Sequence, residues 1–233
     1  MRKLRVDVWS DIACPWCYVG KRRLEAAVAR MPPGHVAVVW RSFELDPKAA
    51  RAPRAKASYA ERLAKKYRSS LAQANATIER MTKVGAADGL SLRFDRVRPT
   101  NTFDAHRVLH LARERGVQGA VKERLMRAYF TEGEALADAK ALARLSGEAG
   151  LDPDEVRCVL AGDTYADAVR ADEEEAWQLG IHAVPFFGLG GVYGVSGAQP
   201  VEVLHGALTQ AWAEAPEQGT PEASACGRDR GRE

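Results

Sequence analysis

Two cysteines separated by two residues carry the clearest chemical signal in this sequence. Cys14, Pro15, Trp16 and Cys17 form a C-x-x-C motif that follows an apolar segment and precedes a helical pattern. A thiolate at the first turn of a helix faces unpaired backbone N–H groups and the positive end of the helix dipole, which favour its ionised form. Cys14 has that position, and Cys17 is close enough to form a disulfide with it. The motif therefore predicts reversible thiol oxidation.

A zinc site is the alternative, because C-x-x-C pairs also occur in zinc knuckles. The remaining cysteines and histidines are Cys158, Cys226, His35, His106, His110, His182 and His205. They contain no second C-x-x-C pair, and only the histidines at 106 and 110 are spaced four residues apart. We therefore favour redox chemistry over zinc binding and expect no metal.

The segments around the motif predict a strand, a helix and a second strand. Residues 4–9 alternate between apolar and polar side chains, as a strand with one buried face does. Apolar residues at helical spacing follow the motif for about 15 residues and stop at the Met-Pro-Pro-Gly sequence of residues 31–34. Residues 35–45 are rich in β-branched and aromatic side chains. A helix between two strands favours parallel pairing.

The rest of the chain is first helical and then returns to a β-pattern. Helices are predicted at 58–68, 71–87, 102–115, 120–130, 138–149, 153–160 and 165–179, and in this part only residues 90–94 have a strand-like pattern. Strands are predicted at 184–189 and 192–195, with Gly190 and Gly191 forming a hairpin turn, and a last helix at 200–214.

This order of elements, βαβ, helices, then ββα, predicts an α/β protein with a mixed sheet. It resembles the thioredoxin fold interrupted by an all-α insertion domain. The expected domains are a discontinuous thioredoxin-like domain (1–50 and 180–214) and a helical insertion domain (51–179). The Pro-, Gly- and Ser-rich residues 215–233 predict a disordered tail.

Four sequence blocks narrow the resemblance. They are DVWSDIACPWCYVGKR at 7–22, NTFDAHR at 101–107, VPFF at 184–187 and SGAQP at 196–200. Together they resemble the FrnE-like branch of the DsbA family, which consists of thiol-disulfide oxidoreductases. The resemblance implies that Cys14 is the nucleophile, Cys17 the resolving thiol and Pro185 a cis-proline packed against the disulfide. Val184 would then present its backbone to a bound peptide or glutathione.

The dipeptide between the cysteines departs from one branch of that family. Periplasmic DsbA proteins have a histidine there, whereas this sequence has Pro15 and Trp16. Because a nearby cation stabilises a thiolate, we expect weaker oxidising power from this motif.

Several residues are predicted to contact the substrate: Pro15, Trp16, Val184, His106 and Asp11. Trp16 is expected to be an exposed aromatic side chain next to Cys14. Asp11 has the position of a proton acceptor, although a turn or capping role is the favoured interpretation. His106 fits a cleft residue and a packing histidine equally well. Cys158 lies in a helical pattern and is expected to be buried and inert, while Cys226 falls on the tail.

Composition excludes several classes of protein. The 233 residues are 46% hydrophobic and 28% charged with a formal net charge of +3, and neither sign of charge forms a long block. We therefore expect no nucleic-acid partner. No apolar stretch has the length of a signal peptide or a membrane helix, which predicts a cytoplasmic protein without a membrane partner. The expected partners are thiols or disulfides of proteins or small molecules, with glutathione as a candidate co-substrate and no bound cofactor.

Two other functions fit the same fold. Kappa-class glutathione-dependent isomerases and transferases share the interrupted thioredoxin fold but use a serine at the position of Cys14, so the presence of both cysteines argues against this class. A chaperone-like binding module would instead use an apolar groove between the domains.

Overall fold

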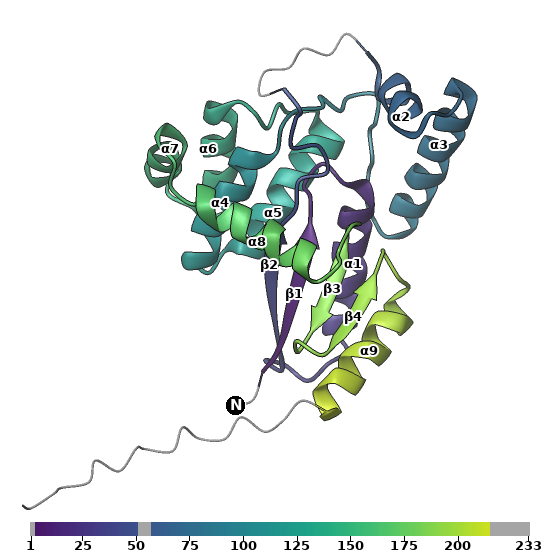
Figure 1. Cartoon of the computed structure of the whole chain (residues 1–233). Coiled ribbons are helices and arrows are strands. Elements are labelled where there is room, and N and C mark those ends of the chain that lie inside the picture. Colours follow the sequence, from purple (N-terminus) through teal and green to yellow (C-terminus); the bar gives the residue numbers. More distant parts are fainter. Residues whose placement is uncertain (1–2, 51–56, 215–233) are drawn as a thin grey trace, which may run out of the picture.

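A four-stranded mixed sheet is the centre of the fold. The computed structural model describes residues 3–50 and 57–214 and is shown in Figure 1. The strands are β1 (Leu4–Ser10), β2 (Val36–Ser42), β3 (Phe186–Leu189) and β4 (Tyr193–Ser196), in the order β2-β1-β3-β4. β1 pairs in parallel with β2 and antiparallel with β3, and β3 pairs antiparallel with β4. The predicted mixed sheet is confirmed.

The helices connect and cover this sheet. They are α1 (Pro15–Val28), α2 (Tyr59–Tyr67), α3 (Leu71–Ala87), α4 (Phe103–Glu114), α5 (Gln118–Arg127), the π-helical turn η1 (Ala128–Glu132), α6 (Ala139–Glu148), α7 (Pro153–Ala161), α8 (Ala166–Gln178) and α9 (Val201–Glu214). The chain runs through α2 to α8 between β2 and β3, as the predicted helical insertion requires.

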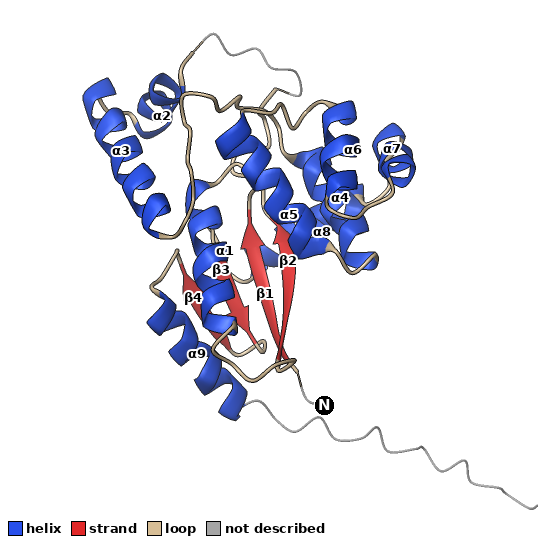
Figure 2. Cartoon of the chain, turned by 180° about the vertical axis from the view of Figure 1, so that it is seen from behind, coloured by secondary structure: helices blue, strands red, loops and turns tan. Residues whose placement is uncertain are grey.

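The side-chain alternation of β1 explains why both faces of the sheet are covered. Val6 and Val8 are fully buried on one face, in an apolar cluster with Leu24 of α1 and residues of α9. Trp9 belongs to a separate cluster with Ala176 of α8. Figure 2 shows α1 and α9 in front of the sheet, and Figure 1 shows α8 crossing its other face.

The hairpin between β3 and β4 has the predicted glycine turn. Gly190 and Gly191 have φ angles of 62° and 73°, in the left-handed region that a two-residue hairpin turn of this kind needs. The turn fixes the register in which Phe187 pairs with Val195. β3 in turn pairs with β1, so the hairpin places the residues before Phe186 beside the end of β1.

The largest apolar cluster joins the start of α1 to the helical insertion. It contains Ile12, Cys14 and Cys17 together with residues of the inserted helices, such as Leu125 and Phe130. The C-x-x-C motif is therefore enclosed by side chains from both parts of the chain. We retain the division into a thioredoxin-like domain and an insertion domain as a proposal.

Two local predictions were wrong. Residues 90–94, all of which are described, form no strand; the N–H of Arg93 donates to the carbonyl oxygen of Phe130 at 2.8 Å instead. Cys158 is exposed rather than buried, because α7 turns Val156 and Val159 inward and leaves the residue between them facing outward. Cys226 and the predicted tail lie outside the described residues. Within the described ranges, no helix has both the length and the apolar character needed to cross a membrane.

Candidate active site

Cys14 is the N-cap residue of α1. Its backbone has φ −95° and ψ 113°, an extended conformation, and its sulfur accepts the N–H of Cys17 at 3.3 Å. Pro15 occupies the first helical turn, where the absence of an N–H group costs no hydrogen bond. The two residues differ slightly in exposure: Cys14 is 4% exposed and Cys17 is 0% exposed, so Cys14 is the more accessible of the pair.

The loop before β3 forms the opposite side of the site. The Val184–Pro185 peptide bond is cis, the isomer expected from the resemblance. The Cys14 sulfur lies 3.7 Å from the carbonyl oxygen of Val184, to which the thiol donates. The pairing of Trp9 with Phe186 brings the end of β1 and the start of β3 together, which explains how residues 14 and 184 become neighbours.

A glycine permits the close approach of α1 to this loop. A Cβ atom on Gly20 would lie 2.9 Å from Pro185 Cγ and 3.2 Å from Phe187 Cζ. Real Cβ atoms do not approach carbon atoms as closely as 2.9 Å, so any side chain at position 20 would push the loop away. Gly20 therefore helps to hold Pro185 next to the cysteines.

Burial sets the electrostatics of Cys17. Removal from water raises the pKa of its thiol well above the ordinary value, and the neighbouring Cys14 raises it further. The charge of Lys122 acts in the opposite direction. Cys17 is therefore a protonated thiol in the reduced protein, and it must lose this proton before its sulfur can act as a nucleophile.

Asp11 and His106 lie behind the site and not on its surface. Asp11 Oδ2 accepts the N–H of Leu45 at 2.8 Å, Oδ1 accepts that of Ala13 at 3.1 Å, and His106 Nε2 lies 3.5 Å from Oδ1. Burial raises the pKa of Asp11, but His106 and the two N–H groups outweigh it, so the net pKa is lowered. Both side chains are buried. Their role as substrate contacts stays a prediction, and the two N–H groups that Asp11 binds agree with its alternative role in the turn.

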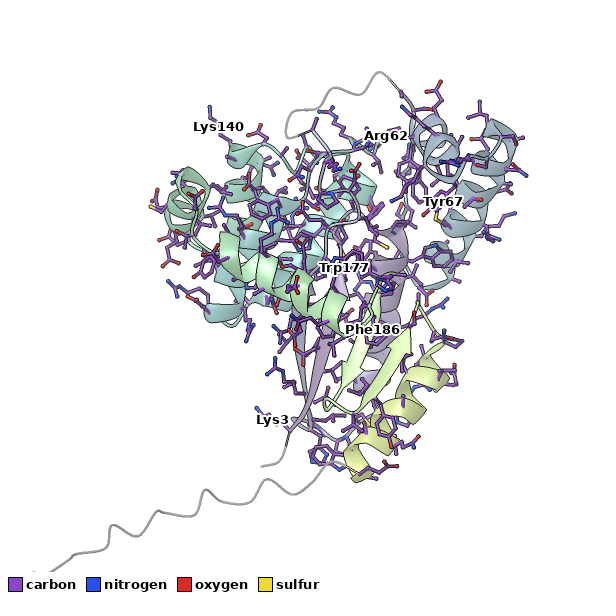
Figure 3. All side chains as sticks on the ribbon, in the orientation of Figure 1. Lys3, Arg62, Tyr67, Lys140, Trp177 and Phe186 are labelled. Atoms are coloured by element: carbon purple, nitrogen blue, oxygen red, sulfur yellow. The ribbon has the colours of Figure 1, made fainter. Side chains whose placement is uncertain are left out.

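The remaining predicted contacts surround Cys14 at partial exposure. Pro15 is buried, while Trp16 and Val184 are half-buried and pack against the large apolar cluster. Trp16, expected to be exposed, is thus partly covered by its packing against this cluster. At the end of α8, Trp177, labelled in Figure 3, is 64% exposed, and its ring centroid lies 4.9 Å from that of His182 in the loop before β3.

These features can be compared with known proteins. The DSBA-like thioredoxin domain family matches residues 5–209 of the chain. The chain belongs to this family. It is thus a DsbA-like enzyme of thiol-disulfide exchange, which agrees with the motif and with the interrupted thioredoxin fold.

Individual relatives cover nearly the whole DsbA-like chain. The crystal structure of a probable DsbA oxidoreductase, SCO1869 of Streptomyces coelicolor, is 48% identical with a TM-score of 0.87, covering 97% of each chain. The uncharacterized protein YwbO of Bacillus subtilis (strain 168) is 28% identical over 88% of this chain and 96% of its own. The cytosolic disulfide reductase DsbM of Pseudomonas aeruginosa, solved with GSH, shares the fold at 17% identity, with a TM-score of 0.56 over 90% of this chain and 96% of its own.

Two residues of the insertion belong to this site and were missed by sequence reasoning. Lys122 of α5 is fully buried, and burial lowers the pKa of its ammonium group to about 8. Tyr59 of α2 packs against the apolar cluster that holds Cys14, and its burial raises the pKa of the phenol. No local pattern marks either residue, because both reach the motif only through tertiary packing.

The described residues offer little for a metal. Within residues 3–50 and 57–214, no group of three or more His, Cys, Asp or Glu side chains is arranged to hold an ion. The buried polar groups near the cysteines, Asp11, His106 and Lys122, come from three separate segments. This arrangement fits sulfur chemistry tuned by buried charges.

Proposed function

We propose that Cys14, Pro15, Trp16 and Cys17 form the redox centre of this oxidoreductase, with Cys14 as the nucleophile and Cys17 as the resolving thiol. One observation carries the proposal. The Cys14 sulfur caps α1, accepts the Cys17 N–H and lies 3.7 Å from the Val184 carbonyl oxygen on the cis-proline loop. The site thereby combines a stabilised sulfur, a second thiol and an adjacent backbone segment that can align an extended substrate.

The exchange proceeds in two displacements. The Cys14 thiolate attacks one sulfur of a substrate disulfide, forms a mixed disulfide and releases the other substrate sulfur as a thiolate, which takes up a proton. Cys17 then loses its proton and attacks the Cys14 sulfur. The bond between Cys14 and the substrate breaks, the second substrate thiolate leaves, and Cys14 and Cys17 remain joined as a disulfide. Two electrons have passed to the substrate, and the reverse sequence oxidises a dithiol.

We favour reductase or isomerase work in the cytoplasm as the physiological direction. The Pro-Trp dipeptide supplies no cation near Cys14, so the reduced form gains less stability than in strongly oxidising relatives. Two glutathione molecules can reduce the Cys14–Cys17 disulfide and leave as glutathione disulfide. The DsbM structure with GSH supports this choice of co-substrate at the level of the fold. No bound cofactor is needed.

The test is reduction of insulin disulfides by glutathione, followed in the wild type, Cys14→Ser and Cys17→Ser. We expect Cys14→Ser to fall to the uncatalysed rate and Cys17→Ser to stall as a mixed disulfide. Cys158→Ser is the matched control, because it removes an exposed thiol from α7 without touching the motif. Equal activity in the wild type and Cys14→Ser would refute the proposal.

A chaperone-like role is the second candidate, and one observation favours it. At the end of α8, Trp177 and Leu179 are 64% and 60% exposed, an apolar surface that can bind an unfolded polypeptide. Suppression of aggregation that survives replacement of both cysteines would support this role as a separate activity. Formation of glutathione thioethers by the purified protein would instead support the kappa-like class.

A further inference from the structure

Lys122 is an unusual lysine for a soluble protein. Its side chain is 0% exposed, and its Nζ atom has no hydrogen-bond partner among the described residues. The Nζ atom lies 5.1 Å from the centroid of the Trp40 ring, a cation–π contact that favours the charged form. A buried ammonium group without an acceptor is costly to fold, so its presence calls for a compensating role.

A network of ion pairs fixes α5, the helix of Lys122, against α1. Glu123 accepts hydrogen bonds from Tyr18 at 2.7 Å, Lys21 at 2.7 Å and Arg22 at 2.5 Å. Tyr18 directly follows Cys17, and Lys21 lies one helical turn after it on the same face of α1. The network therefore clamps the residue after Lys122 to the turn of α1 that contains Cys17.

The charges that face Lys122 come from every element packed around it. Cys14, Cys17 and Asp11 favour its protonated form, and Lys21 opposes it. Lys21 is already paired with Glu25 at 2.5 Å and with Glu123, so its charge is compensated. Asp11 is held by two backbone N–H groups and His106. No acidic side chain pairs with Lys122 among the described residues, so its charge can act on the sulfurs of Cys14 and Cys17.

We propose that Lys122 stabilises the Cys17 thiolate when Cys17 resolves the mixed disulfide, so that the helical insertion supplies a positioning residue to the redox centre. The inference rests on the proposed function of the two cysteines. At pH 7, below its pKa of about 8, Lys122 stays protonated through both displacements. The proton of Cys17 leaves to water, its sulfur electron pair forms the bond to Cys14, and the substrate sulfur leaves with the electron pair of the broken bond and takes up a proton.

The two displacements can be timed separately with 5,5′-dithiobis(2-nitrobenzoate). Attack by Cys14 releases the first coloured thiolate, and attack by Cys17 on the resulting mixed disulfide releases the second. We expect Lys122→Met to slow only the second release. If the Cys17 pKa rises by one unit, the fraction of Cys17 present as thiolate near pH 7 falls about tenfold. A thiolate of higher pKa is also about threefold more nucleophilic. The rate of the second release should therefore fall about threefold for each unit.

The pH profile separates this role from a packing defect. Above its pKa of about 8, Lys122 loses its charge, so the second release in the wild type and in Lys122→Met should converge as the pH rises. Lys122→Arg, which keeps the charge, should restore the rate near pH 7, and Lys122→Gln serves as the second neutral variant if Lys122→Met does not fold. An unchanged second release with an unchanged pH profile in a folded neutral variant would overturn the proposal. If instead the assignment of Cys14 as the nucleophile is wrong, Cys14→Ser will still give the first release. That result differs from the one that would overturn the role of Lys122.

Discussion

Replacing Lys122 with methionine should make the protein more stable at neutral pH. The pKa of this lysine falls from near 10.5 in the unfolded chain to about 8 in the folded protein. Each unit of pKa corresponds to 1.36 kcal/mol, so the charged lysine costs about 3 kcal/mol when both states are protonated. The contact with the Trp40 ring favours the charged form but does not offset this cost. Methionine keeps the length of the side chain and removes the charge.

The sign of the pH dependence follows from linkage. Because the folded pKa is depressed, the unfolded state binds more protons between pH 8 and pH 10.5, and wild-type stability rises with pH in that window. The advantage of Lys122→Met should therefore be full below pH 8 and vanish above about pH 10.5.

Urea unfolding of the oxidised proteins measures the difference in unfolding free energy between the wild type and Lys122→Met. In the oxidised form Cys14 and Cys17 are joined as a disulfide, so their thiols do not titrate in the pH range used. In the oxidised form the cysteines carry no negative charge to support the ammonium group, so the advantage should be at least as large as in the reduced form. Lys122→Arg is the matched control and should show no gain. A Lys122→Met protein that is less stable at pH 7, or an advantage that stays constant up to pH 11, would refute the electrostatic reasoning.

Three other residues give independent tests. Gly20→Ala should push Pro185 away from the cysteines, destabilise the protein by about 1–3 kcal/mol and slow insulin reduction; a fully active, equally stable variant would contradict the packing described for α1. Asp172→Asn should cost about 3 kcal/mol at pH 7, because Asp172 accepts from Arg41 at 2.7 Å and from the Ser42 N–H at 2.8 Å. The folded pKa of Asp172 is lowered, so this contribution is lost as the pH falls below about 4, and acid unfolding curves that keep a constant gap would argue against it. Trp16→Ala should raise the KM for insulin about fivefold, equivalent to about 1 kcal/mol, while reaction with 5,5′-dithiobis(2-nitrobenzoate) changes little; equal effects on both substrates would exclude a polypeptide contact.

The sheet was predictable because its information is local. The alternation in residues 4–9 and the glycine pair at 190–191 determine where strands begin and turn, and both agree with the observed β1 and β3–β4 hairpin. The cysteine pair at the start of a helix identified the chemistry for the same reason. Burial on the helices was less predictable. Cys158 is flanked by apolar residues in sequence, but a helix rotates about 100° per residue and its side chain points outward.

The contacts between distant residues of the site could not be predicted from the sequence. Asp11 and His106 are separated by 94 residues in the sequence, and only the folded chain brings His106 Nε2 within 3.5 Å of the carboxylate. Lys122 has the spacing of an ordinary surface lysine on a helix, and its burial follows from the packing of α5 against α4, α6 and β2. Sequence patterns identify the two sulfurs, while the buried charges that tune them require the tertiary structure.

Peptide mapping of a trapped mixed disulfide decides which sulfur meets the substrate. Cys17→Ser is incubated with oxidised insulin chains or glutathione disulfide, quenched in acid and analysed by mass spectrometry without reduction. We expect the adduct on Cys14 and none on the exposed Cys158, and Cys14→Ser should give no adduct on the buried Cys17. An adduct on Cys17 in Cys14→Ser, at a level equal to that on Cys14 in Cys17→Ser, would contradict the assignment of nucleophile and resolving thiol.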